Sequence, residues 1–327
     1  MLKLKHCFLF VCAGVVFGIL QQSGALAQDA FPSKPVRFIA PFSAGGPTDL
    51  LARVIGQKLN ELWGQPVVVE NRPGAGGNIG AEVVAKAVPD GHTLLVSASS
   101  VAINPSIYSK MPFDTAKDLA PIGLAGVVPN VLVVHPSVPV TNVRELISFA
   151  HKNPRALQYG SGGSGTGSHL IGELFQHMTE TQLVHIPYKG GSQYAMALLT
   201  GEVAVAFSNM VSALPHVRTG KIKALGVTSS SRSEFLPKVP TIAESGVPGF
   251  EADSWYGVFT TGRTPQETVR TLNEALLKTL DMQDVRERLH SLGVIPKKMT
   301  SQEFAAFVAS EMKKWGDVVR ISKAKVE

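Results

Sequence analysis

Cysteine is nearly absent from this chain of 327 residues, which contains only Cys7 and Cys12. Both lie in a segment with a basic start, an apolar run that ends at Leu20, and a close at Ala25-Leu26-Ala27. This pattern predicts a secretory signal over residues 1–27 that is cleaved after Ala27. The mature chain then has no thiol, which excludes disulfides, cysteine-bound zinc and cysteine nucleophiles.

Several other signals are missing after residue 27. No apolar run is long enough to cross a bilayer, and the histidines show neither H-E-x-x-H nor another spacing of paired metal ligands. The chain has no Walker phosphate-binding sequence and no G-x-S-x-G nucleophile elbow. Its net charge of +6, or +4 without Lys3 and Lys5, is spread along the chain without a basic block. We therefore expect no metal, no cofactor and no nucleic-acid partner.

Short runs rich in valine and isoleucine alternate with helical patterns along the mature chain. This alternation is typical of α/β proteins in which helices flank parallel sheets. We expect two α/β lobes, each with a mainly parallel sheet, joined by crossings near 127–133 and 224–230. The first lobe is expected to comprise 28–128 with 229–327, and the second 129–228. The predicted strands are 36–40, 66–71, 93–98, 131–135, 157–161, 183–188, 203–209, 222–228 and 255–261, and the predicted helices are 48–62, 78–88, from 142, from 168, near 192, 265–280, 282–292 and 301–323.

The expected carboxyl ends of the strands combine glycine with serine, threonine or asparagine. Ligands of α/β sheets bind at these ends, where such residues offer hydrogen-bond donors and close approach of the backbone. The segments are SAGGPT, SASSVAIN, GSGGSGTGSH, YKGGS and SNMVS, and the second makes Ser97, Ser99 and Ser100 candidate ligand contacts. Gly160–Gly165 matches a dinucleotide fingerprint, but the acidic residue expected about 20 positions later is absent. We interpret this loop as an anion cradle.

The segment PFSAGGPTDLLAR, residues 41–53, predicts a strand end, two glycines and a helix that begins near Thr48. The N–H groups at a helix N-terminus suit an anion because they carry a partial positive charge. An ordinary turn explains the same residues, with Thr48 as the N-cap and Asp49 as a first-turn acid. His169 and Tyr188 also have two interpretations, since each either faces the cleft or serves capping and packing.

Seven longer segments carry a resemblance to a known family: KPVRFIAPFSAGGPTDLLAR, VVVENRPGAGGNIGAEVVAKAVPDGHTLL, INPSIY, GSHLIGELF, VHIPYKG, KALGVTSSSR and VPTIAESGVPGFEADSWYG. They resemble the Bug family, the extracytoplasmic receptors of tripartite tricarboxylate transporters. The resemblance covers nearly the whole mature chain, and ENRPGAGG with the first Gly-Gly-x-x-Asp loop is its most specific part. It implies a periplasmic binding protein of the type II clamshell kind, without catalysis. Its two lobes would close on a small di- or tricarboxylate and deliver it to the transporter's membrane subunits.

The resemblance also implies where the ligand is held. In the family, loop amides and small polar side chains of both lobes bind one carboxylate, partly through water. Many relatives resemble F-D-N where this chain has Phe207, Ser208 and Asn209, and loss of that aspartate weakens the case for an amino-acid ligand. Asp49 remains a candidate partner for an ammonium group or a water molecule. The residues expected at the site are Phe42, Gly46, Thr48, Asp49, Ser161, Ser164, Thr166, Ser168, His169, Tyr188, Lys189, Ser208 and Asn209.

Two other functions stay open on the sequence alone. A secreted hydrolase could use a serine of the Gly-rich loop with His169 as its base, but the loop lacks a nucleophile elbow and a convincing acid partner. A sensor for a membrane kinase would use the same two lobes as an importer, so the sequence does not separate these roles. We expect a periplasmic monomer, and the sequence does not identify its carboxylate.

We predict that the exported protein begins at Gln28, because the apolar run belongs to a cleaved signal. N-terminal sequencing of the exported protein measures this directly. Recovery of a chain that keeps the apolar run would contradict the prediction.

Overall fold

The structure is a computed structural model that describes residues 31–322, 324 and 325. The predicted signal at 1–27 and its cleavage site lie outside the described residues. The helices and strands given below belong to one compact unit, Lys34–Glu327. Within the part of the chain that the structure describes, no helix is both long enough and apolar enough to cross a membrane.

The first sheet has five strands in the order β2-β1-β3-β10-β4. β1 pairs in parallel with β2 and β3, whereas β10 pairs antiparallel with β3 and β4. β1 has fully buried apolar residues on both faces, Val36 and Phe38 on one and Ile39 on the other, as expected for a strand covered by helices from both sides. The strands are β1(Val36–Ala40), β2(Val67–Asn71), β3(Thr93–Ala98), β4(Leu119–Val128) and β10(Ser254–Thr261).

The second sheet repeats this arrangement in the order β7-β6-β8-β5-β9. β6 pairs in parallel with β7 and β8, and β5 pairs antiparallel with β8 and β9. Each sheet therefore has four strands in one direction and one strand in the other. The strands are β5(Asn130–Val134), β6(Gln158–Ser161), β7(Val184–Pro187), β8(Val205–Asn209) and β9(Lys223–Val227).

The antiparallel strands result from the way the chain passes between the sheets. β4 ends at Val128 and β5 begins at Asn130, so the chain enters the second sheet immediately after leaving the first, against the direction of its other strands. β10 is the corresponding strand of the return path. β5 and β10 were predicted as strands, but their antiparallel pairing and β4 itself were not predicted. Pro121, Gly123 and Gly126 weaken the strand pattern of β4.

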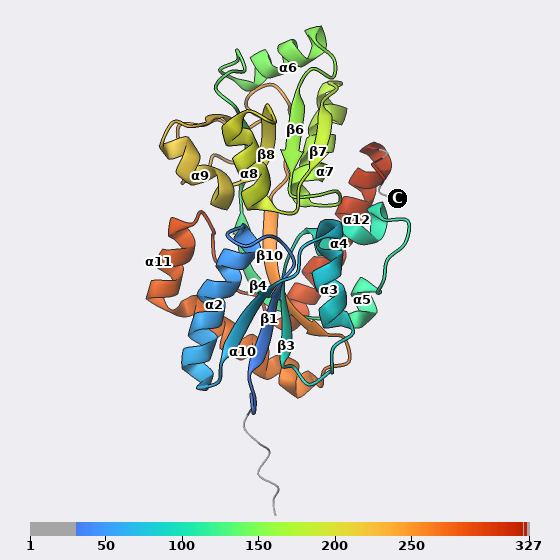
Figure 1. Ribbon diagram of the computed structural model, residues 1–327, viewed down its shortest axis with the longest axis vertical. Coiled ribbons are helices and arrows are strands. Elements are labelled where there is room, and N and C mark those ends of the chain that lie inside the picture. Colours follow the sequence, from blue (N-terminus) through green and yellow to red (C-terminus); the bar gives the residue numbers. More distant parts are fainter. Residues whose placement is uncertain (1–30, 323, 326–327) are drawn as a thin grey trace, which may run out of the picture. The chain divides into compact units, whose positions relative to one another are not determined.

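Helices cover both faces of the first sheet. α2 contacts β1, β2 and β3, while α3 contacts β1, β3 and β10; Figure 1 shows α2 and α3 on opposite sides of these strands. α4 and α5 were not predicted, and the other long helices differ from their predicted bounds by a few residues. The helices are α2(Pro47–Trp63), η1(Ala75–Gly77), α3(Asn78–Ala85), α4(Ser100–Ile107), α5(Thr115–Asp118), α10(Gln266–Asp281), α11(Gln283–Ser291) and α12(Ser301–Ser322).

The second sheet has its own flanking helices. α7 contacts β6 and β8, and α8 contacts the same two strands; in Figure 1 they lie on opposite sides of β6 and β8. α6 begins with a capping box, in which the N–H of Glu145 donates to Asn142 Oδ1 at 3.0 Å and the N–H of Thr141 donates to Glu145 Oε2. The helices are α6(Val143–Lys152), α7(Gly167–Thr179), α8(Gly191–Thr200) and α9(Met210–Arg218), of which α9 was not predicted.

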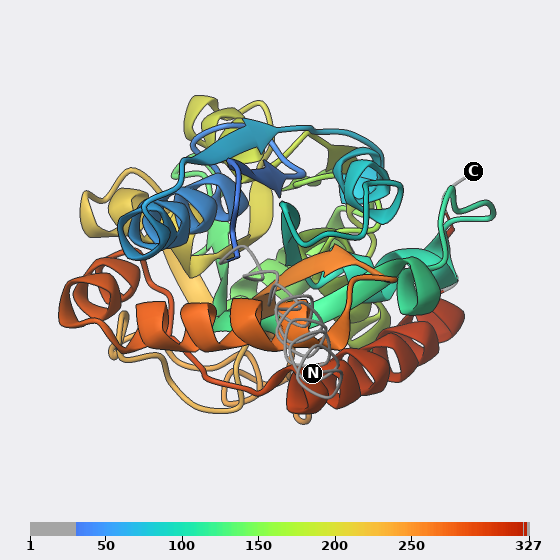
Figure 2. The ribbon, with the colours of Figure 1, turned by 90° about the horizontal axis from the view of Figure 1, so that it is seen from below.

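Helix α12 joins the cores of the two sheets. Its residues Phe304 and Val308 pack in the first core with Trp255, whereas Trp315 and Val319 belong to the second core. Figure 2 shows α12 in red as a long continuous helix beside the orange α10. Glu311 lies between the two groups and is buried. One of its oxygens accepts hydrogen bonds from Trp255 Nε1 at 2.8 Å and from Trp315 Nε1 at 2.9 Å.

The chain segment after β9 stays with the second sheet. The N–H of Ile242 donates to the Val227 carbonyl at 2.8 Å, and Ile242, Val247, Phe250 and Ala252 are buried in the second core. This differs from the crossing predicted near 224–230. We propose that the second boundary between the lobes lies near residue 253, in place of the predicted 228/229, while the first stays at 128/129.

Loss of the Glu311 carboxylate is expected to destabilise the fold. Glu311→Ala leaves two buried indole N–H groups without an acceptor, and each such group costs about 1–3 kcal/mol. We therefore predict a free energy of unfolding that is lower by about 2–4 kcal/mol, measured by urea denaturation. Glu274→Ala removes an exposed carboxylate paired with Arg270 and should change it by about 1 kcal/mol or less. Equal effects of the two substitutions would contradict this role of Glu311.

Candidate functional site

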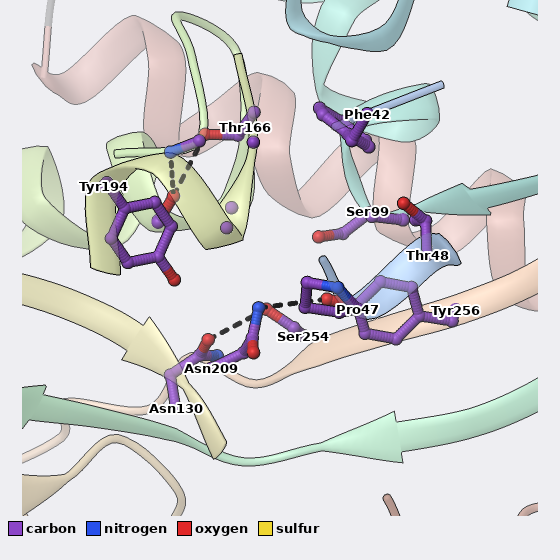
Figure 3. Close-up of a pocket in the computed structure, with 16 residues that line it drawn as sticks. Phe42, Pro47, Thr48, Ser99, Asn130, Thr166, Tyr194, Asn209, Ser254 and Tyr256 are labelled. Carbon is purple, nitrogen blue, oxygen red and sulfur yellow. Dashed lines mark hydrogen bonds between the residues drawn. The ribbon is translucent and has the colours of Figure 1, made fainter. Parts of the chain in front are cut away.

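A cavity lies between the two sheets, where their strand ends meet. The parallel strands β1, β3, β6, β7 and β8 reach it by their carboxyl ends, and the antiparallel strands β5 and β10 by their first residues. The cavity has a volume of about 50 Å³. A single water needs about 10–15 Å³ on the same measure, so the cavity has room for more than one water. The lining residues, shown in Figure 3, are Phe42, Pro47, Thr48, Ala98, Ser99, Asn130, Gly162, Thr166, Gly167, Ser168, Gly190, Gly191, Tyr194, Asn209, Ser254 and Tyr256.

Among the described helices, α2, α4, α7 and α8 begin at this cavity. Their N-cap residues are Gly46, Ser99, Thr166 and Gly190, and none of these forms a side-chain capping hydrogen bond. The first N–H groups of a helix have no acceptor within the helix, and together with the helix dipole they favour an anion. The four helix starts therefore direct partial positive charge and free donors toward the same cavity.

The described residues that line the cavity include no Asp, Glu, Lys, Arg or His. Positive potential inside it thus comes from backbone dipoles and neutral donors. The Thr48 side chain is 1% exposed, and its Oγ1 has no hydrogen-bond partner among the described residues. A buried hydroxyl without a partner is unfavourable, so Thr48 offers a donor that the folded chain alone does not use.

The Gly-rich loop after β6 supplies the second-lobe wall. Thr166 Oγ1 donates to the Gly163 carbonyl at 2.6 Å, and the N–H of Gly162 donates to Ser168 Oγ at 3.0 Å. These bonds hold the loop at the start of α7 while leaving the Ser168 hydroxyl proton free for Thr166 or for a ligand. A Cβ at Gly167 would lie 3.0 Å from Ser99 Oγ of the first lobe. Glycine at 167 therefore permits the close approach of the two lobes.

Paired polar residues of β5, β8 and β10 form another wall. Ser254 Oγ donates to Asn130 Oδ1 at 3.0 Å, and Asn209 Nδ2 donates to Tyr256 Oη at 3.1 Å. Figure 3 shows these residues on the opposite side of the cavity from Thr166. The bond from Asn209 to Tyr256 joins the second lobe to the first.

Other hydrogen bonds hold the lobes together around the cavity. Ser43 Oγ lies 2.9 Å from Ser192 Oγ, and the N–H of Ser43 donates to the Lys189 carbonyl at 3.1 Å. Tyr108 Oη donates to the Ser164 carbonyl at 3.0 Å. The structure therefore has the lobes in contact around the cavity.

The sequence matches the family described as "Tripartite tricarboxylate transporter family receptor" over residues 51–323. The chain belongs to this receptor family. Protein BugT of Bordetella pertussis (strain Tohama I) is 36% identical to the receptor over 321 residues, which cover 98% of each chain. These matches confirm the family resemblance noted in the sequence.

Solved structures with clear sequence similarity have the same fold. The structure of R. palustris Rpa4515 with adipate has a TM-score of 0.88 and 36% identity, and the match covers 90% of the receptor and 100% of that chain. MatC (Rpa3494) from Rhodopseudomonas palustris with bound malate has a TM-score of 0.83 and 34% identity, with 88% and 100% covered. The receptor therefore has the predicted two-lobed α/β fold of periplasmic binding proteins.

Six residues that the sequence indicated line the cavity of the receptor: Phe42, Thr48, Ser99, Thr166, Ser168 and Asn209. Gly46 is the N-cap of α2, just outside the lining, and Ser100 is the first residue of α4. Ser164, Tyr188 and Lys189 line a separate groove that shares Phe42 and Gly162 with the cavity. A ligand contact by any of these residues stays a prediction.

Asp49 does not line the cavity. Its carboxylate accepts from the Gly45 N–H at 2.9 Å and forms an ion pair with Arg53 at 2.9 Å. Burial alone would raise the pKa of Asp49, but the bonds from Arg53 and Gly45 outweigh it and lower that pKa below its ordinary value. Asp49 thus stays charged and stabilises the loop beside Thr48.

The remaining predicted residues form hydrogen bonds outside the cavity lining. Ser97 Oγ donates to the Ala98 carbonyl at 3.3 Å, and Ser208 Oγ lies 3.0 Å from Tyr194 Oη. Ser161 Oγ lies 2.6 Å from His185 Nε2. These three side chains support the walls of the cavity from behind.

His169 is stacked on His185 beneath the Gly-rich loop, with 4.0 Å between ring centroids. Burial lowers the pKa of His169 to about 4, and burial with the neighbouring His169 lowers the pKa of His185 to about 3. The N–H of Gly165 donates to His169 Nδ1 at 3.2 Å. Both rings are therefore neutral near pH 7. Ser161 contacts His185, whereas the base considered for a hydrolase was His169.

The sequence did not indicate Asn130, Tyr194, Ser254 or Tyr256, although all four line the cavity. Asn130 and Tyr194 carry no local motif. Ser254 and Tyr256 lie in the segment SWYG, which belongs to the family resemblance and was the available signal. Within residues 31–322 and 324–325, no group of three or more His, Cys, Asp or Glu side chains could hold a metal ion.

Asp253 gives the receptor a pH-dependent stability. Burial, with smaller contributions from the Glu251 and Glu311 carboxylates and against the lowering effect of Lys314, raises the pKa of Asp253 to about 6. The unfolded chain has the ordinary value near 4, so the folded state holds an extra proton between about pH 4 and 6. Stability from this group is therefore present at low pH and is lost as the pH rises through that window.

We predict that Asp253→Asn raises the free energy of unfolding at pH 7.5 by about 1–3 kcal/mol and has little effect below pH 4. Urea denaturation of both proteins across pH 4–8 measures the difference. Parallel pH profiles for the two proteins would contradict the assignment.

Proposed function

We propose that this receptor is a periplasmic solute-binding protein. It captures a small carboxylate between its lobes and delivers it to the membrane subunits of a tripartite tricarboxylate transporter. The observation that carries this proposal is the convergence of four uncapped helix starts on a cavity without charged side chains. A carboxylate supplies the acceptors and the negative charge that these N–H groups lack.

The chemistry of the cavity favours ligands without a positive charge. An ammonium group needs an anionic or carbonyl partner, and no acidic side chain lies among the described lining residues. Asp49, the candidate partner for ammonium, is held by Arg53 and Gly45. The proposed ligand class is therefore a di- or tricarboxylate with no amino group, and the adipate and malate bound by relatives support it.

Binding is proposed to require both lobes. Thr48 and Ser99 come from the first lobe, while Thr166, Ser168 and the start of α8 come from the second. Contacts to all of these groups exist only when the lobes are closed, and they offset the cost of ordering the hinge. The receptor is proposed to act as a monomer, because one chain supplies the residues of both walls. The predicted site residues that do not line the cavity are proposed to act indirectly, by holding the loops that do line it.

Thr48 provides a sharp test of this site. Thr48→Val keeps the shape of the side chain and removes its hydroxyl, so we predict an affinity for the best dicarboxylate that is lower by about tenfold. Stability without ligand should be unchanged or higher, because the hydroxyl has no partner in the folded chain. A thermal-shift screen of C4–C8 acids followed by calorimetry measures both quantities.

Thr279→Val is a matched control, since Thr279 Oγ1 is also buried without a hydrogen-bond partner but lies on α10, outside the cavity lining. It should leave the affinity unchanged. The proposal fails if no carboxylate binds, or if Thr48→Val and Thr279→Val have the same affinity as the unmodified receptor.

A further inference from the structure

The orientation of Asn209 is fixed by two hydrogen bonds. Its Oδ1 accepts from the Ser212 N–H at 3.0 Å, which caps helix α9. Its Nδ2 donates to Tyr256 Oη at 3.1 Å. A backbone N–H can only donate, so the oxygen of the Asn209 amide must face Ser212 and the nitrogen must face Tyr256.

Tyr256 Oη is therefore the acceptor in this pair, and its own hydroxyl proton is not used in the bond. The side chain of Tyr256 is 4% exposed, so this proton has little access to bulk water. Among the described residues, no acceptor for it is found. Burial raises the pKa of Tyr256 above its ordinary value, and the hydroxyl stays protonated at physiological pH.

The other hydroxyl groups of this wall donate their protons in hydrogen bonds within the protein. Ser254 donates to Asn130 Oδ1, and the Asn130 amide is oriented by its own donation to the Ala252 carbonyl at 3.3 Å. Ser208 donates to the Asn209 carbonyl at 3.3 Å, so the proton of Tyr194 is directed to Ser208. Of the hydroxyl groups on this wall, the one of Tyr256 therefore has a proton available for a hydrogen bond to a ligand.

We propose that Tyr256 binds a second oxygen acceptor of the ligand, the distal carboxylate of a dicarboxylate, and thereby selects dicarboxylates over monocarboxylates. This inference rests on the proposed function, in which the first carboxylate lies at the helix starts. Figure 3 shows Tyr256 and Asn209 across the cavity from Thr166, as a ligand with two polar ends requires.

Asn209 acts here as a positioning residue. It belongs to the second lobe, whereas Tyr256 lies on β10 of the first sheet, so their hydrogen bond links the two lobes in this structure. Closure then orients the Tyr256 hydroxyl, and a ligand that reaches it with an acceptor stabilises the closed state. A monocarboxylate leaves the same proton unpaired in a buried site.

The test compares unbranched dicarboxylates of four to eight carbons with monocarboxylates of the same length, by calorimetry on the full mature chain. For the best pair, we expect the receptor to bind the dicarboxylate at least about tenfold more tightly, the size of one hydrogen bond to a charged group. Tyr256→Phe also removes the inter-lobe bond from Asn209, so it should weaken the monocarboxylate by about the factor that Tyr108→Phe does, and the dicarboxylate by about a further tenfold. The ratio of the two dissociation constants then approaches one.

Tyr108→Phe is the matched control. It also removes a hydroxyl that bonds across the lobes, to the Ser164 carbonyl, but Tyr108 does not line the cavity. It should weaken both acids by the same factor and keep their ratio. The inference is overturned if Tyr256→Phe changes both acids equally or neither. If no acid of either kind binds to the unmodified receptor, the proposed function fails and this inference fails with it.

Discussion

Backbone N–H groups without partners are the constraint on which the centre of this molecule depends. A parallel strand followed by a helix places the start of that helix at the carboxyl end of the sheet, and both sheets turn those ends toward one cavity. Side-chain caps would satisfy the N–H groups of α2, α4, α7 and α8, yet their N-cap residues form none. The donors therefore remain available for the carboxylate proposed above.

The two lobes are held by connections that differ in stiffness. The strands β4 and β10 continue directly into the other lobe, and they place Asn130 and Ser254 at the crossing itself. Helix α12 joins the two cores through Trp255, Glu311 and Trp315. With the lobe boundaries proposed above, opening of the cavity would be accommodated around Glu311 and residues 129 and 253, because the strands on either side are buried in the two cores.

Most of the fold could be predicted from the sequence because its signals are local. The period of valine-rich strands and amphipathic helices located every strand except β4 and most of the helices, and the Gly/Ser loops after the strands indicated several residues that line the cavity. Asp49 and His169 show the limit of this reasoning. Both follow a cavity-lining residue in the sequence, but the side chain of Asp49 pairs with Arg53 and that of His169 stacks on His185. The antiparallel placement of β10 depends on pairing with β3 and β4, which are distant in sequence. The positions of Ser254 and Tyr256 follow from that pairing.

Buried hydroxyl groups without hydrogen-bond partners relate the stability of the free receptor to its affinity for the proposed ligand. A buried hydroxyl such as Thr48 Oγ1 costs about 1–3 kcal/mol while it lacks a partner. A carboxylate that accepts this proton recovers the cost, and the recovered free energy appears as affinity. The role proposed for Tyr256 extends the same relation to selectivity, since a ligand with a second acceptor would satisfy its proton. In this proposal, discrimination between ligands comes from donors that the protein leaves unpaired, and it requires no charged residue in the lining.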